Sequence, residues 1–357
     1  MKKNVIFVAM HYPSENIPEA GQKISYQNLK KYVEEGCNVH LITFVNKNEK
    51  KYTYENEFFY CASIEIIDIN NFMRFFNFIR NFSLPLKIGI RNSSVFKHKL
   101  NRLLDIYPDA YIHIEYEEGA NFLFGINNEA KVVFHDIISQ SIKRFLDKEK
   151  NFFRKQWLLF QYFITMRWEK KIIKEKFEKI VLNDKDKDLL VDMGCCESEI
   201  TVLYPVVSNK FSLVDTSNRS KKNILFWGAM NRFENQDAIL WFIEEIFPLV
   251  IKKNPYIVLY IVGANPSDNI LKLSSKNIIV TGFVDNPIVF FEKCSVAIVP
   301  LRYGAGIKIK VLEALAAKLQ VVSTSVGAEG IRNKEGLLYT EDTIEGFANK
   351  VIELTLE

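Results

Sequence analysis

The sequence predicts an α/β protein made of two domains, each built on a parallel β-sheet. Runs of apolar, β-branched residues alternate with longer helical patterns along the chain, which is typical of strand–helix–strand units. The alternation begins again after 201–223, a polar stretch that carries Pro205 and lacks periodicity. The length of 357 residues also suits two domains that each bury a core.

The first half of the chain contains five expected strands and one well-marked helix. In the segment 25–36, SYQNLKKYVEEG, polar and apolar residues fall at helical spacing, and Gly36 suits the C-cap. We expect one α/β domain over residues 1–205. Its expected strands are NVIFVAM (4–10), NVHLITF (38–44), AYIHIEY (110–116), KVVFHD (131–136) and KIVLND (179–184).

The second half repeats this pattern over residues 206–357, with an interdomain linker near 206–220 and a helix over 237–253. Its strands end in Gly, Pro or Ser/Thr, which places permissive backbone at the carboxyl edge of a parallel sheet. Ligands of such sheets bind at that edge. The expected strands are NILFWG (223–228), VLYIVG (258–263), NIIVTG (277–282), VAIVP (296–300) and QVVST (320–324).

The composition narrows the possible partners and compartment. Lys and Arg number 47 against 43 acidic residues, a net charge of +4, which is far below the charge density of a nucleic-acid-binding protein. Five cysteines form neither the spacing of a zinc site nor the even count of a disulfide framework, so a reducing cytoplasm is expected. The apolar N-terminal run is too short for a signal peptide, and no stretch approaches the ~18 apolar residues of a membrane span.

The segment 300–330, PLRYGAGIKIKVLEALAAKLQVVSTSVGAEG, carries the most chemical information. Gly304 and Gly306 precede an expected helix, where backbone N–H groups and the helix dipole bind anions. Lys308 and Lys310 are expected in the first helical turn, where that dipole disfavours cations. A bound diphosphate would remove this conflict.

Helical spacing places Gly306, Lys310 and Glu313 on one face of the same expected helix. The Glu313 carboxylate would then lie one turn beyond the phosphates, where it could accept hydrogen bonds from ribose hydroxyls. The alternative is that the glycines only form a tight turn, the lysines are solvated and Glu313 pairs with a neighbour.

GAGIKIKVLEALA (304–316) followed by VVSTSVGAEG (321–330) resembles the donor-binding signature of GT-B glycosyltransferases, specifically glycosyltransferase family 4, the group 1 glycosyltransferases. The resemblance covers roughly the last 140 residues well and the first 200 loosely. It implies two Rossmann-like domains that face each other across a cleft, with the nucleotide on the C-terminal side and the acceptor on the N-terminal side. Supporting segments are ILFWGAM (224–230), IVGANP (261–266), VTGFVDN (280–286) and FHD (134–136).

The resemblance also implies roles for individual residues. Glu313 would bind the ribose, Phe283 and Val284 would lie near the base, and His135 would lie beside the transferred sugar. Gly21 stands where the first strand–helix loop approaches the diphosphate. The full donor-binding set is Gly21, Phe283, Val284, Gly304, Gly306, Lys308, Lys310 and Glu313, and the catalytic set is His135 and Glu329.

The chain departs from the family pattern at several positions. Ala305 occupies the position of the first of two family Glu residues, and Lys308 replaces a usual glycine. Glu329, in the GAEG loop, is the candidate that would replace the missing carboxylate. The usual Arg and Lys after the first strand of the second domain are absent, and the residues there are Asn231, Arg232 and Asn235.

The expected reaction is transfer of a hexose-type sugar from a nucleotide-diphospho-sugar to a glycan, lipid-linked or protein acceptor, with retention implied by the resemblance. We expect no metal, because Lys308 and Lys310 would stabilise the leaving diphosphate. NDKDKD (183–188) resembles a metal-nucleotide motif, but Asn183 as a helix cap explains it better. A non-hydrolysing nucleotide-sugar epimerase and a non-catalytic partner subunit, the latter suggested by Ala305, remain alternatives.

Two segments mix basic and aromatic residues, 71–91 and 154–174. Such segments can lie at the surface of an anionic membrane, which would suit a lipid-linked acceptor at the inner face of the cytoplasmic membrane. This interpretation favours the first segment. A packed helix with a solvated basic face explains the second segment nearly as well.

Overall fold

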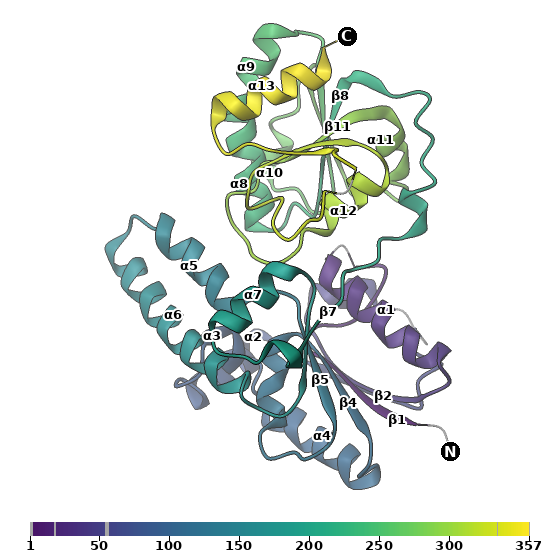
Figure 1. Cartoon of the computed structure of the whole chain (residues 1–357), viewed down its shortest axis with the longest axis vertical. Coiled ribbons are helices and arrows are strands. Elements are labelled where there is room, and N and C mark those ends of the chain that lie inside the picture. Colours follow the sequence, from purple (N-terminus) through teal and green to yellow (C-terminus); the bar gives the residue numbers. More distant parts are fainter. Residues whose placement is uncertain (1–2, 18, 54–56, 334, 357) are drawn as a thin grey trace. The chain divides into compact units, whose positions relative to one another are not determined.

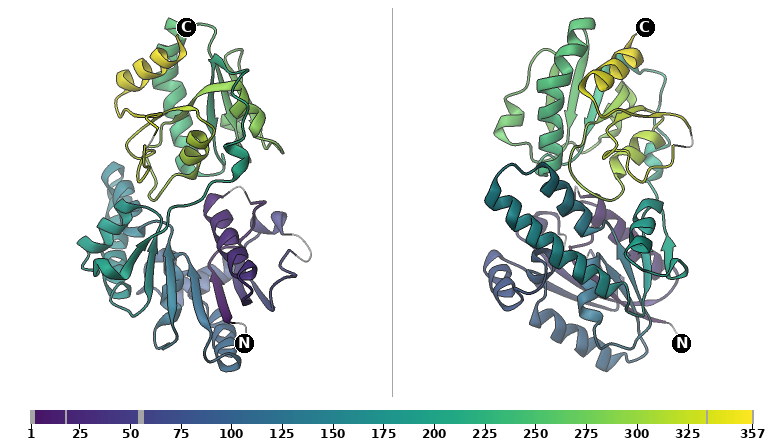
Figure 2. Two further views of the ribbon diagram at one scale, coloured as in Figure 1. Left: turned by 45° about the vertical axis from the view of Figure 1, so that its right-hand side comes forward. Right: turned by 60° about the vertical axis from the view of Figure 1, so that its left-hand side comes forward.

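The chain divides into two compact units, Met1–Tyr204 and Pro205–Glu357 (Figure 1). The expected boundary, between 205 and 206, lies one residue further along the chain. Each unit is a parallel sheet with helices packed on it, as Figure 2 shows from two further directions. The computed structural model describes residues 3–17, 19–53, 57–333 and 335–356.

In the described part of the N-terminal unit, seven strands form one parallel sheet in the order β3-β2-β1-β4-β5-β6-β7. The strand order reverses between β1 and β4, and this switch point is where doubly wound sheets bind ligands. The strands are β1 (Asn4–Ala9), β2 (Asn38–Val45), β3 (Ser63–Asp68), β4 (Tyr111–Glu115), β5 (Ala130–Phe134), β6 (Glu178–Val181) and β7 (Ile200–Val202).

The five strands expected in this half are confirmed, because the central strands are mostly apolar and largely buried. The edge strands β3 and β7 were not predicted. In β3 (SIEIID) Ile64 and Ile66 are exposed while Ser63 and Glu65 are half-buried, and β7 is only three residues long. Strand β6 ends before Asn183, since that residue caps the next helix.

Polar caps begin several helices of this unit. The side chains of Asn70, Asn151 and Asn183 each accept a backbone N–H in the first turn of the helix that follows. The helical segments are α1 (Ala20–Glu34), η1 (Glu49–Tyr52), α2 (Asn71–Arg80), α3 (Leu86–Gly89), α4 (Ser94–Ile106), η2 (Glu117–Leu123), α5 (Ile138–Lys148), α6 (Phe152–Ile172), α7 (Asp184–Asp192) and η3 (Glu197–Glu199).

In the described part of the C-terminal unit, six parallel strands follow the order β10-β9-β8-β11-β12-β13, with the switch point between β8 and β11. The five expected strands are confirmed, and the short β13 was not predicted. The strands are β8 (Ser220–Trp227), β9 (Val258–Val262), β10 (Ile278–Gly282), β11 (Cys294–Val299), β12 (Gln320–Ser323) and β13 (Leu338–Thr340).

The helix expected over 237–253 consists of α8, a π-helical turn and α9, and it begins four residues earlier than expected, at Phe233. The helical segments of this unit are η4 (Asn209–Phe211), α8 (Phe233–Trp241), η5 (Phe242–Ile246), α9 (Phe247–Lys253), α10 (Asp268–Leu271), α11 (Ile288–Lys293), α12 (Ile309–Ala316) and α13 (Ile344–Thr355).

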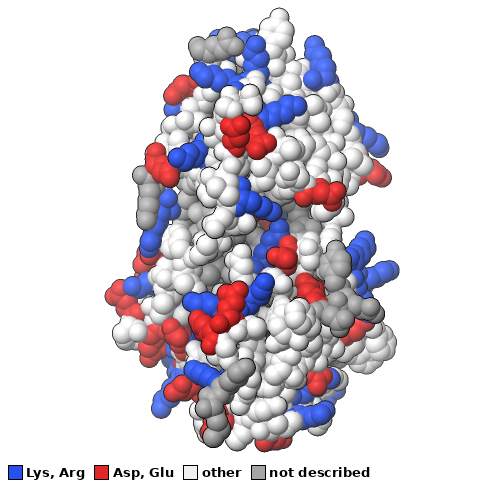
Figure 3. Space-filling model, turned by 90° about the vertical axis from the view of Figure 1, so that its right-hand side faces the viewer, with Lys and Arg blue, Asp and Glu red and all other residues white. Residues whose placement is uncertain are grey.

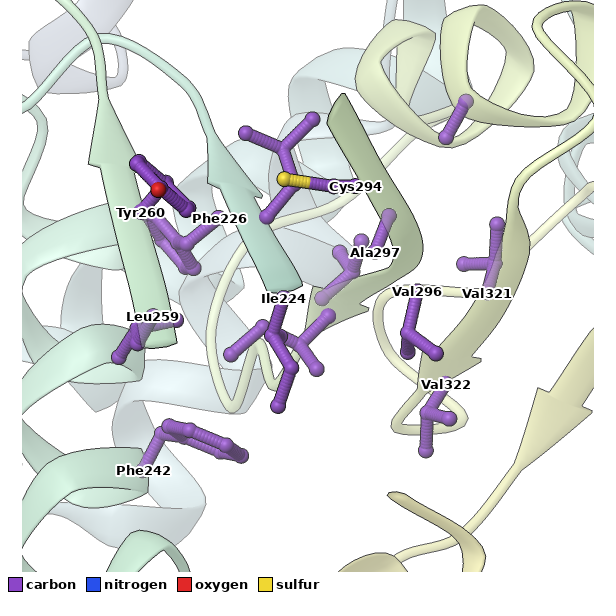
Figure 4. Close-up of a cluster of buried hydrophobic side chains, with 14 of the residues drawn as sticks. Ile224, Phe226, Phe242, Leu259, Tyr260, Cys294, Val296, Ala297, Val321 and Val322 are labelled. Atoms are coloured by element: carbon purple, nitrogen blue, oxygen red, sulfur yellow. The ribbon is translucent and has the colours of Figure 1, made fainter. Parts of the chain in front are cut away.

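The core of the C-terminal unit fills the space between its sheet and the helices. Figure 4 shows Ile224 and Phe226 of β8 near Val296 of β11, with Phe242 below them. All four side chains are fully buried. The same strand order in the two units confirms the predicted fold class, an α/β chain with two Rossmann-like parallel-sheet domains.

Basic and acidic side chains are mixed over the face of the molecule shown in Figure 3. Lys and Arg lie next to Asp and Glu across this face, in keeping with the small net charge of +4. The surface seen there does not have the single-sign field that attracts a nucleic-acid backbone.

Candidate functional site

A glycine-containing loop connects β11 to α12 at the carboxyl edge of the C-terminal sheet. Gly304 and Gly306 have φ values of +108° and +68°, a region that favours glycine over residues with a Cβ. Helix α12 begins at Ile309, and Lys308 is its N-cap residue. The expectation that Lys308 lies in the first helical turn is therefore wrong by one residue.

The Lys308 ammonium folds back over this loop. Its Nζ donates to the carbonyl oxygen of Ala305 at 3.0 Å and to that of Gly306 at 2.5 Å. It also lies 3.8 Å from Oε2 of Glu329, which follows β12, and the two side chains are only 11% and 7% exposed. The structure thus brings Lys308 and Glu329 together as a largely buried ion pair.

Lys310, in the first turn of α12, points to the end of β8. Its Nζ donates to Oδ1 of Asn235 at 2.6 Å. A Cβ on Gly228 would lie 2.7 Å from the same Nζ, so a glycine leaves room for the ammonium. Desolvation and, after it, the positive charges of Arg232 and Lys308 lower the pKa of Lys310 to about 7.

The direction of this pKa shift agrees with the conflict predicted from the sequence, but its causes are desolvation and neighbouring cations rather than the helix dipole. These outweigh the Glu313 and Glu234 carboxylates, which favour the charged form of Lys310. An anion bound beside Lys310 would favour the ammonium form and would raise its pKa again. The electrostatics of the first turn of α12 therefore favour the binding of an anion beside Lys310.

Glu313, one turn further along α12, accepts a hydrogen bond from Nε1 of Trp227 at 2.7 Å. Trp227 is the last residue of β8, so the carboxylate lies at the switch point between β8 and β11. Lys310 and Glu313 share the face of α12 that points to β8, as helical spacing predicted. Gly306 lies in the loop before the helix, so its placement on that face was wrong.

Phe283 and Val284 lie at the same carboxyl edge of the sheet but further from Lys310. They follow β10, which β9 separates from β8. The Phe283 ring is 62% exposed, whereas Val284 packs partly against the core. An exposed aromatic ring at the edge of the sheet has the geometry of a stacking platform for a planar base.

His135 follows β5 at the carboxyl edge of the N-terminal sheet. Its Nε2 lies 2.6 Å from Oε2 of Glu115, and its ring stacks on Tyr116 with centroids 3.9 Å apart. A Cβ on Gly21 would lie 2.6 Å from the Tyr116 hydroxyl and 3.2 Å from His135 Nδ1. The structure therefore brings His135 and Gly21 together, with Gly21 in the first turn of α1.

Glu115 is the buried anchor of this arrangement. It is fully buried and bonds to His113 Nε2 at 2.7 Å through Oε1, which also accepts from Asn28 Nδ2 at 2.7 Å. Burial raises the pKa of Glu115, but hydrogen bonds from His113 and His135 outweigh it and hold the pKa below its usual range. Glu115 thus stays a carboxylate that fixes the orientation of the His135 ring.

A second charged cluster lies at the ends of β1, β4 and β5. Arg91 Nη2 is 3.0 Å from His11 Nε2, and Lys87 Nζ is 3.5 Å from Asp136 Oδ1. The buried Glu118 carboxylate lies 4.0 Å from Lys87 Nζ and 3.9 Å from His11 Nε2. Burial and the Arg91 charge lower the pKa of His11, so its imidazole is neutral near pH 7.

Sequence reasoning missed Glu115, the His11 cluster and the role of Trp227. A usable signal existed for two of these residues: Glu115 and Trp227 each end an expected strand at the carboxyl edge of a parallel sheet, where ligand-binding residues gather. The cluster of His11, Lys87, Arg91 and Glu118 had no comparable signal, because its members come from segments far apart in the chain.

The Asp-x-Asp segment at 183–188 is the start of α7. Asn183 accepts from the backbone N–H of Asp186 at 2.9 Å and donates to its carboxylate at 2.7 Å. Asp184 and Asp186 lie in the first turn, where acidic side chains complement the helix dipole. The capping interpretation of this segment accounts for its residues. Among the described residues, no group of three or more His, Cys, Asp or Glu side chains is arranged to hold a metal ion.

Comparison with known proteins finds a family model that matches the C-terminal unit and a relative that matches most of the chain. Residues 221–356 match the family model described as Glycosyl transferases group 1. An uncharacterized 44.6 kDa protein in the cps region of Klebsiella pneumoniae is 28% identical over 270 residues. That match covers 71% of this chain and 65% of the relative, so the chain spans just under two thirds of the relative's length.

Solved structures share the fold of the whole chain. Anabaena Alr3699/HepE in complex with UDP and glucose has a TM-score of 0.61 and 11% identity, with 98% of this chain and 89% of that chain covered. A glycosyltransferase from Rickettsia africae has a TM-score of 0.60 and 14% identity, with coverage of 99% and 88%. The apo form of the lipopolysaccharide outer core galactosyltransferase WaaB has a TM-score of 0.61 and 12% identity, with coverage of 99% and 90%. These similarities establish the two-domain fold.

Proposed function

We propose that the protein, whose residues 221–356 match the family model described as Glycosyl transferases group 1, transfers a hexose-type sugar from a nucleotide-diphospho-sugar donor. The acceptor is a glycan, a lipid-linked saccharide or a protein. Transfer retains the anomeric configuration and requires no divalent metal. The relative from the cps region of Klebsiella supports a role in polysaccharide biosynthesis.

One observation carries this proposal: two ammonium groups lie at the amino end of α12, and the protein disfavours the charge of one of them. Lys310 has a pKa of about 7 because it is desolvated and close to other cations. A diphosphate at this position would contact the first backbone N–H groups of α12 and both ammonium groups. Its charge would restore the ordinary protonation of Lys310.

The same two lysines serve the chemical step. As the bond between sugar and diphosphate breaks, negative charge grows on the leaving phosphate, and positioned cations stabilise that charge more in the transition state than in the ground state. Glu329 balances Lys308 in the free protein. When the diphosphate binds Lys308 in place of Glu329, the Glu329 carboxylate can accept hydrogen bonds from hydroxyls of the donor sugar.

Glu313 and the N-terminal residues complete the assignment. Trp227 holds the Glu313 carboxylate at the end of β8, one helical turn from Lys310, where it accepts hydrogen bonds from the ribose. In the N-terminal unit Glu115 fixes the orientation of His135, the residue that we propose binds the transferred sugar. The HepE structures contain UDP and UDP-glucose, which supports UDP-sugars as the first donors to test.

Thermal-shift screening of UDP-, GDP-, ADP- and CDP-sugars tests the donor. A ligand present at about 100 times its Kd adds about 2.7 kcal/mol of stability, which is easily measured. We expect one base to stabilise the wild type and the Glu313→Ala variant to lose that stabilisation. Glu353→Ala, at the exposed Lys350–Glu353 pair, is the matched control.

The reaction itself separates the proposal from its alternatives. A transferase releases nucleoside diphosphate in proportion to added acceptor, whereas an epimerase alters the donor without any acceptor. A non-catalytic partner subunit would bind the donor and leave it intact. Donor binding with no acceptor-dependent release of nucleoside diphosphate, across lipid-linked and glycan acceptors, would contradict sugar transfer.

A further inference from the structure

Helix α6 has one face packed on the N-terminal unit and an aromatic face left in solvent. Gln161, Thr165, Trp168 and Ile172 recur at helical spacing and are buried against the domain. The exposed aromatic side chains lie beside or opposite this stripe, except Trp157, which continues the stripe beyond the part that the domain covers. They are Phe152 at 66% exposure, Phe153 at 81%, Trp157 at 45%, Phe160 at 48% and Phe163 at 63%.

The sequence had favoured 71–91 as a membrane-contacting segment and had explained 154–174 nearly as well by a packed helix. In the structure only one stripe of α6 packs on the domain. The N-terminal part of the helix, Phe152–Trp157, is exposed at every residue. Five exposed aromatic side chains on one helix are unusual for a protein surface and mark an interaction site.

The turn between α5 and α6 adds a concentrated positive charge to this face. The two helices pack side by side (Figure 2), so the turn at 149–151 lies at the end of a helical hairpin. Residues 143–155 contain six basic and two acidic side chains, a net charge of +4, which equals the net charge of the whole chain. Lys143, Lys150, Arg154 and Lys155 are all exposed.

Helix α2 places further aromatic side chains near the same hairpin. The backbone N–H of Leu86 at the start of α3 donates to Oε1 of Gln161 in α6 at 2.9 Å. Asn77 of α2 donates to the carbonyl of Ile90, just after α3, at 3.2 Å. Phe72 and Phe75 of α2 are 70% and 60% exposed. Exposed aromatic side chains therefore also occur on α2, which contacts α6 through α3.

We propose that the exposed aromatic face of α6 and the basic end of the α5–α6 hairpin bind the surface of an anionic lipid bilayer. Phe and Trp rings enter the headgroup region, while the neighbouring ammonium and guanidinium groups contact lipid phosphates. The helix lies in the plane of the interface. None of the helices among the described residues is long and apolar enough to cross a membrane.

The pattern of charges selects a bilayer over a protein partner. At FFRK (152–155) two exposed aromatic residues are followed directly by Arg154 and Lys155. Lysine is depleted in the centre of protein interfaces, whereas long basic side chains beside aromatic rings are favoured at a lipid headgroup layer. A second copy of this chain would bring the same positive segment against itself.

Vesicle co-sedimentation tests the proposal with the full chain, and its readout does not depend on the proposed sugar transfer. We expect the protein to sediment with vesicles of phosphatidylcholine and phosphatidylglycerol at low salt, and to remain in the supernatant with phosphatidylcholine alone. The Phe153→Ser/Trp157→Ser/Phe160→Ser variant and the Arg154→Glu/Lys155→Glu variant should each bind at least about tenfold more weakly.

The matched control replaces exposed apolar residues elsewhere. Leu213→Ser/Tyr256→Ser removes side chains that are 82% and 75% exposed in the C-terminal unit and should bind like wild type. Circular dichroism melting establishes that each variant is folded. Wild-type protein that stays in the supernatant with anionic vesicles overturns the proposal, as does undiminished binding by the aromatic variant. Dimers that vanish in the aromatic variant, with no vesicle binding by wild type, would assign the face to a second copy instead.

Discussion

Lys87 of the N-terminal unit and Lys310 of the C-terminal unit are both partly buried lysines at the carboxyl edge of a parallel sheet, yet their pKa values move in opposite directions. Burial lowers the pKa of Lys87, but Asp136 and Glu118 outweigh it and raise the pKa above its ordinary value. Desolvation, Arg232 and Lys308 lower the pKa of Lys310 to about 7.

The difference lies in the partners that each unit supplies. Lys87 has two carboxylates within 4.0 Å, so its charge is balanced within the protein. Lys310 hydrogen-bonds to the neutral amide of Asn235, and two cations lie near it. Lys87 is thus paired at the N-terminal edge, whereas Lys310 at the C-terminal edge carries a positive charge that an incoming anion can balance.

The largest effect is expected at Lys310. Replacing it in Lys310→Met removes the cation that the leaving diphosphate requires, so we expect kcat/KM for the donor to fall by about 100- to 1,000-fold. Initial-rate kinetics at saturating acceptor measure this. Lys350→Met, at a half-buried lysine that pairs with Glu353 one helical turn away and lies over the Tyr339 ring, is the control. An equal fall in kcat/KM in both variants would contradict the proposed difference between Lys310 and Lys350.

The Glu115→Gln variant tests whether the N-terminal sheet edge depends on the hydrogen bonds between Glu115 and its two histidines. This change leaves two histidines beside a neutral amide in a fully buried site, so we expect the free energy of unfolding to fall by about 1–3 kcal/mol at neutral pH. Lys310→Met, by contrast, removes a desolvated amine and should leave stability unchanged or higher. Urea denaturation measures both. A stable Glu115→Gln protein would show that the N-terminal edge does not depend on pairing.

The pH dependence of Glu115 has a defined sign. Because its pKa in the folded protein is lower than in the unfolded chain, the unfolded state takes up protons first as pH falls. The stability contributed by Glu115 is fully present above its ordinary pKa, near 4.5, and is lost below it. Glu115→Gln should therefore lose less stability than wild type on acidification. Denaturation curves at neutral and acidic pH measure this difference.

Donor affinity should fall as pH rises through about 7. Lys310 in the free protein loses its proton there, whereas the bound diphosphate requires the ammonium form. One required proton weakens binding by up to about tenfold per pH unit above that value. Isothermal titration across this range measures the slope, and Lys310→Met should show a flatter profile. Identical slopes would mean that another group controls the dependence.

Gly228→Ala gives the smallest effect. A Cβ there would lie 2.7 Å from Lys310 Nζ and 3.0 Å from Asn235 Nδ2, so the ammonium must shift and donor affinity should fall several-fold, about 1 kcal/mol. Gly36→Ala is the matched control, because Gly36 also has a positive φ, +80°, but faces open space. A donor affinity lowered equally in both variants would indicate backbone strain alone.

Much of the fold could be predicted from the sequence, for a physical reason. Central parallel strands are buried on both faces and read as continuous apolar runs, as in NVIFVA of β1. The missed strands β3, β7 and β13 lie at sheet edges, where partial exposure permits polar residues and short lengths. The ends of elements differed from the prediction where a helix cap determines them. Asn183, for example, lies inside the expected strand 179–184 but caps α7.

The candidate site was predictable only where it is local in sequence. Lys310 and Glu313 share one helix, so their spacing alone placed them together. The pairing of Lys308 with Glu329, and of His135 with Glu115, depends on which strands become neighbours. The sequence contains no direct record of that arrangement. The exposure of the α6 aromatic face likewise depends on which stripe of the helix the domain buries.

A crystal structure of the full chain with the nucleotide-sugar that gives the largest thermal shift tests the central claim most directly. We expect the diphosphate oxygens to lie within hydrogen-bonding distance of Lys310 Nζ and of the first backbone N–H groups of α12. The ribose should contact Glu313. A diphosphate bound elsewhere on the C-terminal unit, with Lys310 still hydrogen-bonded only to Asn235, would contradict the assignment.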